Sequence, residues 1–408
     1  MPILPGLVPT DIYLPARFAD PARWAVVACD QFTSQPDYWQ RVEERVGDAP
    51  SALKLVLPEI YLDKTEEKIK SINAAMRDYL KTGVLTKAVT DGFIITERTL
   101  KAGKRIGLMA AVDLEAYDFT PGTDKLIRAT EGTIIERIPP RVKIRRDAAL
   151  ELPHVMLLIN DSQNTVIEPL YDSVKENAPL YDFELMEDGG HLRGFALTDE
   201  KLINELSEAL EALKIKQNGF LYAVGDGNHS LASAKALYEE IKARIGDKAL
   251  TSPTRYALTE IVNLHSPALT FEPIHRVVFG CSADRLCAEF EKATGLPSGT
   301  DIVFTNGRGF SAGNMLPVAV LQPFLDGWLK NHPEARIDYV HGAAAVNEIC
   351  RGDANTGILL NAIDKSLLFP SVLAGGVLPR KAFSMGEANE KRYYMEARLI
   401  TEPSFIYE

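Results

Sequence analysis

The sequence has few cysteines and no long uninterrupted apolar run. Its four cysteines, Cys29, Cys281, Cys287 and Cys350, form no CxxC pair and no Cys/His cluster with the spacing of zinc ligands. This usage indicates reduced, buried thiols in a cytoplasmic protein. The longest apolar stretch, residues 367–378, is interrupted by proline, serine and glycines, so we expect no membrane span. The first residues also lack the basic start and apolar run of a signal peptide.

The sequence also has fewer basic than acidic residues. Lys and Arg number 45 and Asp and Glu number 56, which gives a net charge of −11. A surface of that sign repels nucleic acid and anionic lipid, so we expect a small-molecule partner, with an oligomer left open. The 46% of hydrophobic and 25% of charged residues are typical of a globular protein with a sizeable core.

Apolar periodicity predicts an α/β fold of the mixed α+β kind, with mixed sheets and flanking helices. We expect helices over residues 63–82, 198–215, 229–245 and 343–351, and strands over residues 93–98, 105–113, 153–160, 220–224, 337–341 and 357–363. A break at Gly189-Gly190 suggests a boundary near residue 195. It would separate an N-terminal α/β region (1–195) from a C-terminal α/β region (196–408), with one continuous domain as the alternative.

The strongest candidate site is the five-residue DGNHS turn (residues 226–230), which lies between an expected strand and an expected helix. The free N–H groups and dipole at the start of a helix attract anions. Gly227 permits a close approach of the backbone, Asn228 and Ser230 offer ligand atoms, and His229 can move a proton. Asp226 could orient His229 or bind a metal that bridges phosphates. The competing interpretation is that Asp226 and Asn228 simply cap the helix.

A basic segment interrupts the acidic chain between residues 128 and 146. In a strand, Arg141, Lys143 and Arg145 would point to one face, where they could bind phosphate or carboxylate groups. Within the Glu-Gly-Thr piece of this segment, Glu131 could supply a base and Thr133 a hydroxyl ligand. The alternative is a solvated strand whose charges pair with acids. The cations of the segment are Arg128, Arg137, Arg141, Lys143, Arg145 and Arg146.

Other candidates are isolated residues. Asp30 follows the apolar run 25–29 at an expected strand end, where catalytic carboxylates often occur, although a turn-forming Asp explains it nearly as well. His154 is interpreted as a core histidine. Near the C-terminus, Lys381, Glu387, Lys391 and Arg392 could reach a site or could be ordinary surface residues.

The chain resembles the bacterial and archaeal domain-of-unknown-function family numbered 1015 over nearly its whole length. The likeness is carried by Ala28-Cys29-Asp30, Leu57-Pro58-Glu59, Glu131-Gly132-Thr133, Asp226-Gly227-Asn228-His229 and Leu378-Pro379-Arg380-Lys381. Where the family's turn is of the DGHHR type, this chain has Asn228 and Ser230. That turn is also similar to one in the ParB/sulfiredoxin-like superfamily, which includes a free-serine kinase and nucleotide-hydrolysing partitioning proteins. The resemblance implies that residues 226–230 bind phosphate.

Together these features predict an enzyme of phosphoryl transfer, kinase- or phosphatase-like, acting on a small polar metabolite such as serine or phosphoserine. It would use Mg²⁺ and a nucleotide, because phosphoryl transfer needs the phosphate charge to be neutralised. His229, Asp226, Asp30 and Glu131 would be catalytic. The phosphate- or substrate-binding residues would be Gly227, Asn228, Ser230, Arg128, Thr133, Arg137, Arg141, Lys143, Arg145 and Lys381. The alternative is a ParB-like regulatory protein that responds to a nucleotide without turnover.

Overall fold

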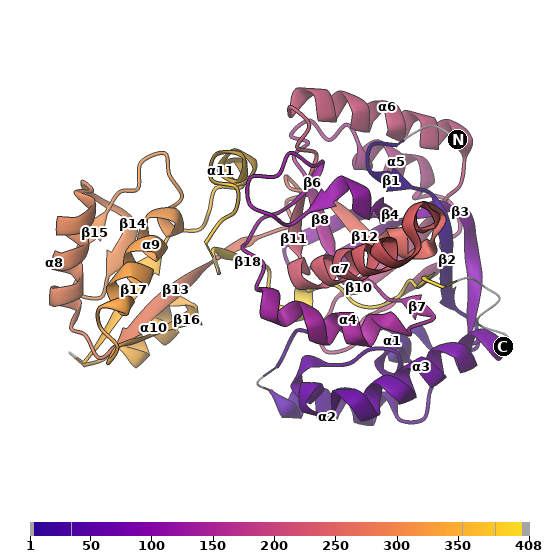
Figure 1. Cartoon of the computed structure of the whole chain (residues 1–408), viewed down its shortest axis with the longest axis horizontal. Coiled ribbons are helices and arrows are strands. Elements are labelled where there is room, and N and C mark those ends of the chain that lie inside the picture. The colour runs from indigo at the N-terminus through magenta and orange to yellow at the C-terminus, as the bar shows by residue number, and fades with distance from the viewer. Residues whose placement is uncertain (1–3, 34, 353, 380, 402–408) are drawn as a thin grey trace. The chain divides into compact units, whose positions relative to one another are not determined.

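The computed structural model describes residues 4–33, 35–352, 354–379 and 381–401. Contacts between residues divide the chain into two units, whose elements are labelled in Figure 1. The first unit comprises residues up to 129, residues 133–269 and those from 387 onward, and the second comprises residues 130–132 and 270–386. The boundary expected near residue 195 falls inside strand β10 (His191–Leu197) of the first unit. The Gly189-Gly190 break belongs to the turn that joins β10 to its antiparallel partner β9 (Tyr181–Glu184).

A mixed sheet forms the centre of the first unit. Its antiparallel hairpin and its parallel pairs confirm the expectation of mixed sheets. Among the described residues its strands lie in the order β5 (Tyr117–Asp118), β6 (Ile127–Ala129), β11 (Tyr222–Asp226), β8 (Met156–Ile159), β12 (Tyr256–Asn263), β4 (Gly103–Asp113), β3 (Leu85–Leu100), β10 and β9. At its margins β1 (Leu7–Val8) pairs with β4 and β2 (Thr10–Pro15) pairs with β3, while β7 (Leu150–Glu151) and β19 (Arg398–Leu399) form a separate pair.

Helices cover both faces of this sheet. Side chains alternate along β3, so that Phe93 and Ile95 enter one core and Ile94 enters the other. The core that contains Phe93 is closed by α5 (Ile167–Val174), α6 (Glu200–Lys216) and α7 (Asn228–Ile245), as Figure 1 shows. The opposite core is closed by α1 (Pro21–Trp24), α2 (Pro36–Val46) and α3 (Thr65–Lys81). A further helix, α4 (Ile138–Arg146), packs Ile138 and Val142 against α7.

The second unit contains a smaller sheet with its own helices. Among the described residues its strands lie in the order β15 (Gly309–Phe310), β14 (Ser298–Phe304), β17 (Asn355–Leu360), β13 (Phe271–Phe279) and β16 (Arg336–His341), and β18 (Phe383–Met385) also pairs with β13. Its helices are α8 (Ala283–Thr294), α9 (Pro317–Lys330), α10 (Ala343–Ile349) and α11 (Leu368–Gly375). Short 3₁₀ turns in the two units are η1 (Ala52–Lys54), η2 (Glu59–Lys64), η3 (Leu114–Ala116), η4 (Ile135–Arg137), η5 (Gly246–Thr251), η6 (Pro253–Arg255), η7 (Lys365–Leu367) and η8 (Ala388–Glu390).

The helices and strands expected from periodicity are confirmed, with end positions that differ by a few residues except in β3, which begins at Leu85, eight residues before the expected start. α6 begins at Glu200 because Asp199 accepts hydrogen bonds from the N–H groups of residues 201 and 202, which satisfies two donors of its first turn. The predicted helices over 63–82, 229–245 and 343–351 are α3, α7 and α10. No helix in the described part of the chain combines the length and the apolar character that crossing a bilayer requires.

A buried group of charges lies within the first unit. Glu260 on β12 is 2% exposed, lies 3.0 Å from a guanidinium nitrogen of Arg392, and accepts a 2.8 Å hydrogen bond from Thr96. Burial alone would raise the pKa of Glu260, but Arg392 and Arg105 lower it to about 2. Removing one member of such a group leaves an uncompensated charge in the core.

Candidate functional site

The DGNHS turn connects β11 to α7 with one residue in the left-handed region. Gly227 has φ 76°, and a Cβ added there would lie 3.0 Å from the Cα of Val155 and 3.4 Å from the His154 ring. Glycine therefore provides both the backbone conformation and the close approach of the neighbouring chain. As a result, the start of α7 lies directly against His154.

The polar side chains of the turn do not cap the helix. The N-cap residue is Gly227, and no side chain makes a capping hydrogen bond. Asp226 instead accepts a 3.0 Å bond from the Gly227 N–H with one oxygen, while its other oxygen lies 3.4 Å from Nζ of Lys391. The side-chain oxygen of Asn228 is buried and has no hydrogen-bond partner among the described residues. The capping interpretation therefore explains neither residue.

The next two residues of the turn have different surroundings. Nε2 of His229 accepts a 3.2 Å hydrogen bond from the backbone N–H of Ile134, so this nitrogen is engaged with the chain before α4. Ser230 lines a cavity. The first backbone bond of the helix runs from Leu231 N to Gly227 O, which leaves the N–H groups of Asn228 and Ser230 outside the helical ladder.

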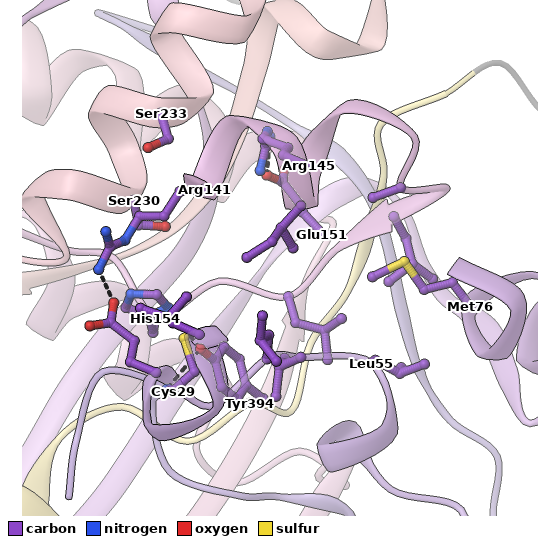
Figure 2. Close-up of a pocket in the computed structure, with 18 residues that line it drawn as sticks. Cys29, Leu55, Met76, Arg141, Arg145, Glu151, His154, Ser230, Ser233 and Tyr394 are labelled. Carbon is purple, nitrogen blue, oxygen red and sulfur yellow. Dashed lines mark hydrogen bonds and ion pairs between the residues drawn. The ribbon is translucent and has the colours of Figure 1, made fainter. Parts of the chain in front are cut away.

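This cavity has a volume of about 130 Å³ and lies within the first unit (Figure 2). It joins the start of α7 to α4, to the end of α3 and to the segments around Cys29 and Tyr394. Its lining residues are Cys29, Leu55, Val56, Leu57, Glu59, Leu62, Met76, Arg141, Ile144, Arg145, Ala148, Leu150, Glu151, Leu152, His154, Ser230, Ser233 and Tyr394. Three of the expected phosphate ligands, Arg141, Arg145 and Ser230, thus share one cavity although Ser230 comes from a different part of the sequence.

Residues 138–146 of the basic segment form helix α4, so the interpretation of Arg141, Lys143 and Arg145 as part of a strand was wrong. Pro139 and Pro140 begin α4, which suits proline because the first N–H groups of a helix have no intrahelical partner. On a helix, residues four apart share a face, so Arg141 and Arg145 line the cavity and Lys143 does not.

Acids compensate most of the cations in this helix. Glu59 pairs with Arg141 and Glu151 pairs with Arg145 at the cavity. The outward cations pair as well, Lys143 with Glu66 at 2.5 Å and Arg146 with Glu240 at 2.6 Å. The exposed Arg137 contributes its carbonyl oxygen, which accepts a 2.8 Å bond from Arg141.

The remaining sequence candidates are spread over both units. Arg128 on β6 donates to the carbonyl oxygen of Lys125 at 2.8 Å and lies over the Phe220 ring. The hydroxyl of Thr133 is buried without a hydrogen-bond partner among the described residues. Glu131 and Lys381 belong to the second unit.

Within that second unit, Glu131 makes an isolated β-bridge to Leu378. The carbonyl oxygen of Lys381 accepts a 2.9 Å bond from Arg276. Neither residue lines the cavity of the first unit.

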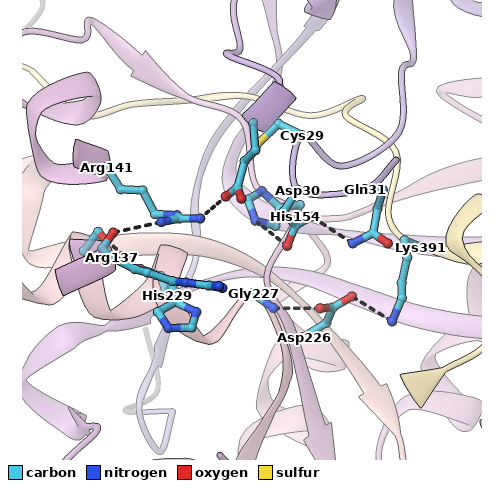
Figure 3. A network of polar contacts seen from close by, with 12 residues as sticks. Cys29, Asp30, Gln31, Arg137, Arg141, His154, Asp226, Gly227, His229 and Lys391 are labelled. Atoms are coloured by element: carbon cyan, nitrogen blue, oxygen red, sulfur yellow. Dashed lines mark hydrogen bonds and ion pairs between the residues drawn. The ribbon is translucent and has the colours of Figure 1, made fainter. Parts of the chain in front are cut away.

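His154 is part of the cavity wall, which its interpretation as a core histidine did not anticipate. The hydroxyl of Tyr394 accepts a 3.1 Å bond from the Cys29 N–H and lies 2.8 Å from Nδ1 of His154. When the Tyr394 hydroxyl donates a hydrogen bond to Nδ1 of His154, the neutral imidazole carries its proton on Nε2. That nitrogen is 4.0 Å from the carboxylate of Asp30 (Figure 3).

Asp30 is the acid of this polar network. Burial alone would raise its pKa, but His154, Gln31 and Lys391 lower it below the ordinary value. Asp30 is therefore ionised at neutral pH. The thiol of Cys29 next to it behaves in the opposite way, because burial and the Asp30 charge raise its pKa to about 12. A thiol with that pKa is not a nucleophile near pH 7.

Sequence patterns gave little indication that Lys391, Tyr394 and His154 belong to the same polar network. Lys391 was one of several candidate cations near the C-terminus, and no motif marks Tyr394 or His154. Tyr394 and His154 are 240 positions apart in the sequence.

Metal ligands are few at this site. The described residues contain no group of three or more His, Cys, Asp or Glu side chains that could hold a metal ion. Asp226, the unpartnered oxygen of Asn228 and the hydroxyl of Ser230 are the side-chain oxygens that the turn itself offers. Mg²⁺ is commonly bound by one or two protein oxygens together with substrate phosphates, so this donor set fits a metal that arrives with a phosphorylated ligand.

Comparison with known proteins gives a family and several distant structural likenesses. The family described as "Protein of unknown function (DUF1015)" matches residues 14–348. Among curated proteins, none matches the sequence. A free serine kinase variant in complex with AMP has 10% identity and a TM-score of 0.39, with 70% of this chain and 90% of that chain covered.

Two further solved structures match this chain with similar sequence identity, TM-score and coverage. A conserved hypothetical protein from Pyrococcus furiosus has 11% identity and a TM-score of 0.33, covering 72% of this chain and 93% of that chain. A C-terminally truncated SbnI from Staphylococcus aureus has 12% identity and a TM-score of 0.34, covering 71% and 85%.

Proposed function

We propose a function from the site itself, because the chain belongs to the DUF1015 family, whose description names no activity. The proposed function is phosphoryl transfer between a nucleotide and the hydroxyl group of a small metabolite, with serine and phosphoserine as the polar reference compounds of the first test. One observation carries it: the uncapped start of α7 and the cavity beside it share Ser230, and the cavity also contains Arg141.

The start of α7 has the properties of a phosphate-binding corner. Backbone N–H groups outside the helical ladder donate to anions, and the helix dipole adds partial positive charge there. The hydroxyl of Ser230 and the guanidinium of Arg141 are further donors on the cavity wall. The buried oxygen of Asn228 is an acceptor, so it suits a hydroxyl or amino group of the ligand, or a cation.

Asp30 is the proposed base. In phosphoryl transfer a carboxylate accepts the proton of the attacking hydroxyl group. The hydroxyl oxygen forms the new bond to phosphorus while the bond between that phosphorus and the bridging oxygen of the nucleotide breaks, and the shortened nucleotide leaves. The lowered pKa of Asp30 keeps its carboxylate ionised and ready to accept a hydrogen bond from that hydroxyl. His154, with Nε2 at 4.0 Å, helps to orient the carboxylate.

A magnesium ion would neutralise phosphate charge at this site. Asp226 and Asn228 would hold it together with phosphate oxygens of the ligand. Lys391, at 3.4 Å from Asp226, already provides one positive charge on the same carboxylate.

The decisive test separates binding from turnover. Wild type is first screened by thermal shift against nucleotides and phosphorylated metabolites, and transfer from a labelled nucleoside triphosphate to serine and other hydroxyl compounds is then measured. We expect Asp30→Asn to bind the nucleotide and lose about 10²–10⁴-fold in turnover. Ser230→Ala should weaken phosphate binding.

The matched control is Asp37→Asn, which changes an exposed carboxyl group in the first turn of α2. This variant should resemble wild type. Equal turnover in Asp30→Asn and wild type would refute the assignment of the base, and the lack of any phosphate- or nucleotide-dependent shift would refute the proposed function.

One observation favours a second candidate, a nucleotide-responsive regulatory protein without turnover. Nε2 of His229, the residue expected to act as base, already accepts a backbone hydrogen bond. Under this alternative the nucleotide would bind tightly, no product would form with any hydroxyl compound, and Asp30→Asn would leave nucleotide affinity and the thermal shift unchanged.

A further inference from the structure

The cavity beside the start of α7 has two chemically different ends. Figure 2 shows Ser230, Arg141, His154 and Cys29 gathered at one end, while Leu55 and Met76 lie at the other. The second end, around Leu55 and Met76, is here called the apolar end. The apolar side chains of the whole cavity wall are Leu55, Val56, Leu57, Leu62, Met76, Ile144, Ala148, Leu150 and Leu152.

The apolar end is made of core residues that face open space. Leu55 is 2% exposed, Leu57 4%, Met76 4% and Leu150 1%, and all four belong to the core beneath α2 and α3. Protein interiors are normally packed to the density of organic crystals, and an apolar surface beside a void loses its dispersion contacts. An apolar ligand group that fills the void restores those contacts.

A small, wholly polar metabolite does not match this lining. Free serine would place its hydroxyl, amino and carboxylate groups in the cavity, and polar groups buried against leucine and methionine lose hydrogen bonds to water. The polar end can satisfy one such group, through Ser230, Arg141 or His154. The apolar end needs a ligand with a hydrocarbon portion.

We infer that the substrate of this site carries an apolar group of about four to six carbons behind its hydroxyl or phosphate-bearing end, and this inference rests on the proposed function. The whole cavity, both ends together, has a volume of about 130 Å³, so an apolar group of this size is the largest that the apolar end can hold. For comparison, an apolar protein cavity of roughly 150 Å³ stays dry and binds benzene. The apolar group occupies the space between α3 and α4, and the phosphorylated end lies at the start of α7.

The test uses three probes that separate the two ends of the cavity. Inorganic phosphate tests the polar end, phenol tests the apolar end, and phenyl phosphate tests both together. Affinities are measured by calorimetric titration of the full chain. We expect phenyl phosphate to bind about tenfold or more tightly than inorganic phosphate, which is the size of effect that a filled apolar pocket gives.

Two variants narrow the apolar end. Ala148→Leu adds three carbons to the wall, and Ile144→Phe enlarges a side chain of α4 that is only partly buried and so tolerates the change if the first variant does not fold. Either should remove the advantage of phenyl phosphate and leave the affinity for inorganic phosphate within about twofold. The matched control is Ile135→Phe, because Ile135 is 58% exposed and lies outside the cavity.

The outcomes distinguish this inference from the proposed function. If phenyl phosphate binds no better than phosphate, or if both narrowing variants fold and keep its advantage, the inference is overturned while phosphate binding stands. If phenol binds and the phosphate group adds nothing, the apolar end is supported and the phosphoryl-transfer proposal fails. If no probe binds, both are refuted.

Discussion

Arg98 should hold the C-terminal segment that carries Lys391 and Tyr394 into the site. This arginine on β3 is 3% exposed and donates hydrogen bonds to the carbonyl oxygens of Gly189 and of residues 389, 390 and 391. Its guanidinium also lies over the Tyr393 ring, 4.9 Å from the ring centroid. One side chain thus fixes three consecutive residues, 389–391, which lie three to five positions before Tyr394, the tyrosine bonded to His154.

The expected loss in the free energy of unfolding follows from the backbone carbonyl groups that would lose their hydrogen-bond donor in Arg98→Met. Hydrogen bonds from a charged group contribute about 1.5–3 kcal/mol each, but they are not additive when one side chain makes them all. Removing one side of a buried charged network typically costs about 3–5 kcal/mol, so we expect the free energy of unfolding to fall by about 4 kcal/mol. Arg98→Lys should lose about half as much, since an ammonium group has three donors and no planar fork.

Denaturant unfolding and amide hydrogen exchange test this prediction together. The matched control is Arg193→Met, because Arg193 also projects from a strand over an aromatic ring at 4.9 Å but its side chain is 27% exposed. Its nearer carboxylate is the exposed Asp182 at 3.2 Å, and the buried Glu97, at 3.8 Å, keeps Lys104 and Tyr171 as partners. That control should lose about 1 kcal/mol or less. Exchange at residues 389–394 should accelerate in Arg98→Met alone. Equal losses in the two variants, or unchanged exchange in that segment, would show that Arg98 does not anchor it.

Three further predictions follow from the same contacts. Glu260→Gln should lower the free energy of unfolding by about 3 kcal/mol at pH 7. Because the folded-state pKa of about 2 lies below the ordinary 4.5, this loss is fully present above pH 4.5, and urea titrations should show it shrink as the pH falls toward 2. Gly227→Ala should lower stability by about 2 kcal/mol, more than Gly246→Ala, which has a similar φ but free space around its Cβ; equal melting temperatures would contradict the close approach. Lys391→Met removes the cation next to Asp226, so phosphate affinity should fall about tenfold in a calorimetric titration, and an unchanged affinity would separate Lys391 from the site.

Local patterns predicted the elements that have a regular apolar period. The hairpin of β3 and β4 and the strand–turn–helix of β11 and α7 are local, because their partners are neighbours in the sequence. Helix α4 was mistaken for a strand because Val142 and Ile144 alternate with cations, although Pro139 and Pro140 at its start favour a helix. Alternation over four residues is too short to separate a strand from one turn of helix.

Contacts between distant segments could not be predicted from any pattern. The boundary was expected near residue 195 because Gly189-Gly190 was interpreted as a linker. In the structure these glycines form a tight turn before β10, in which Gly190 has φ 82° and its carbonyl oxygen accepts a hydrogen bond from the Leu185 N–H. The chain leaves the first unit near residue 270 and rejoins it near residue 387, a path that periodicity does not encode. Tyr394 and Lys391 join the site beside His154 only because of that return.

The pairing of charges changes how the basic segment should be understood. Counting cations in residues 128–146 suggests a strongly positive surface, yet Arg141, Lys143 and Arg145 each have a carboxylate partner within the first unit. A bound phosphate must therefore compete with Glu59 for Arg141, which weakens the attraction that this arginine can offer. Among the described residues no side chain caps the start of α7, so the backbone N–H groups of Asn228 and Ser230 do not compete with a capping side chain. Under the proposed function, the uncapped helix start would therefore be the main source of anion attraction, and Arg141 would add selectivity for ligands that reach into the cavity.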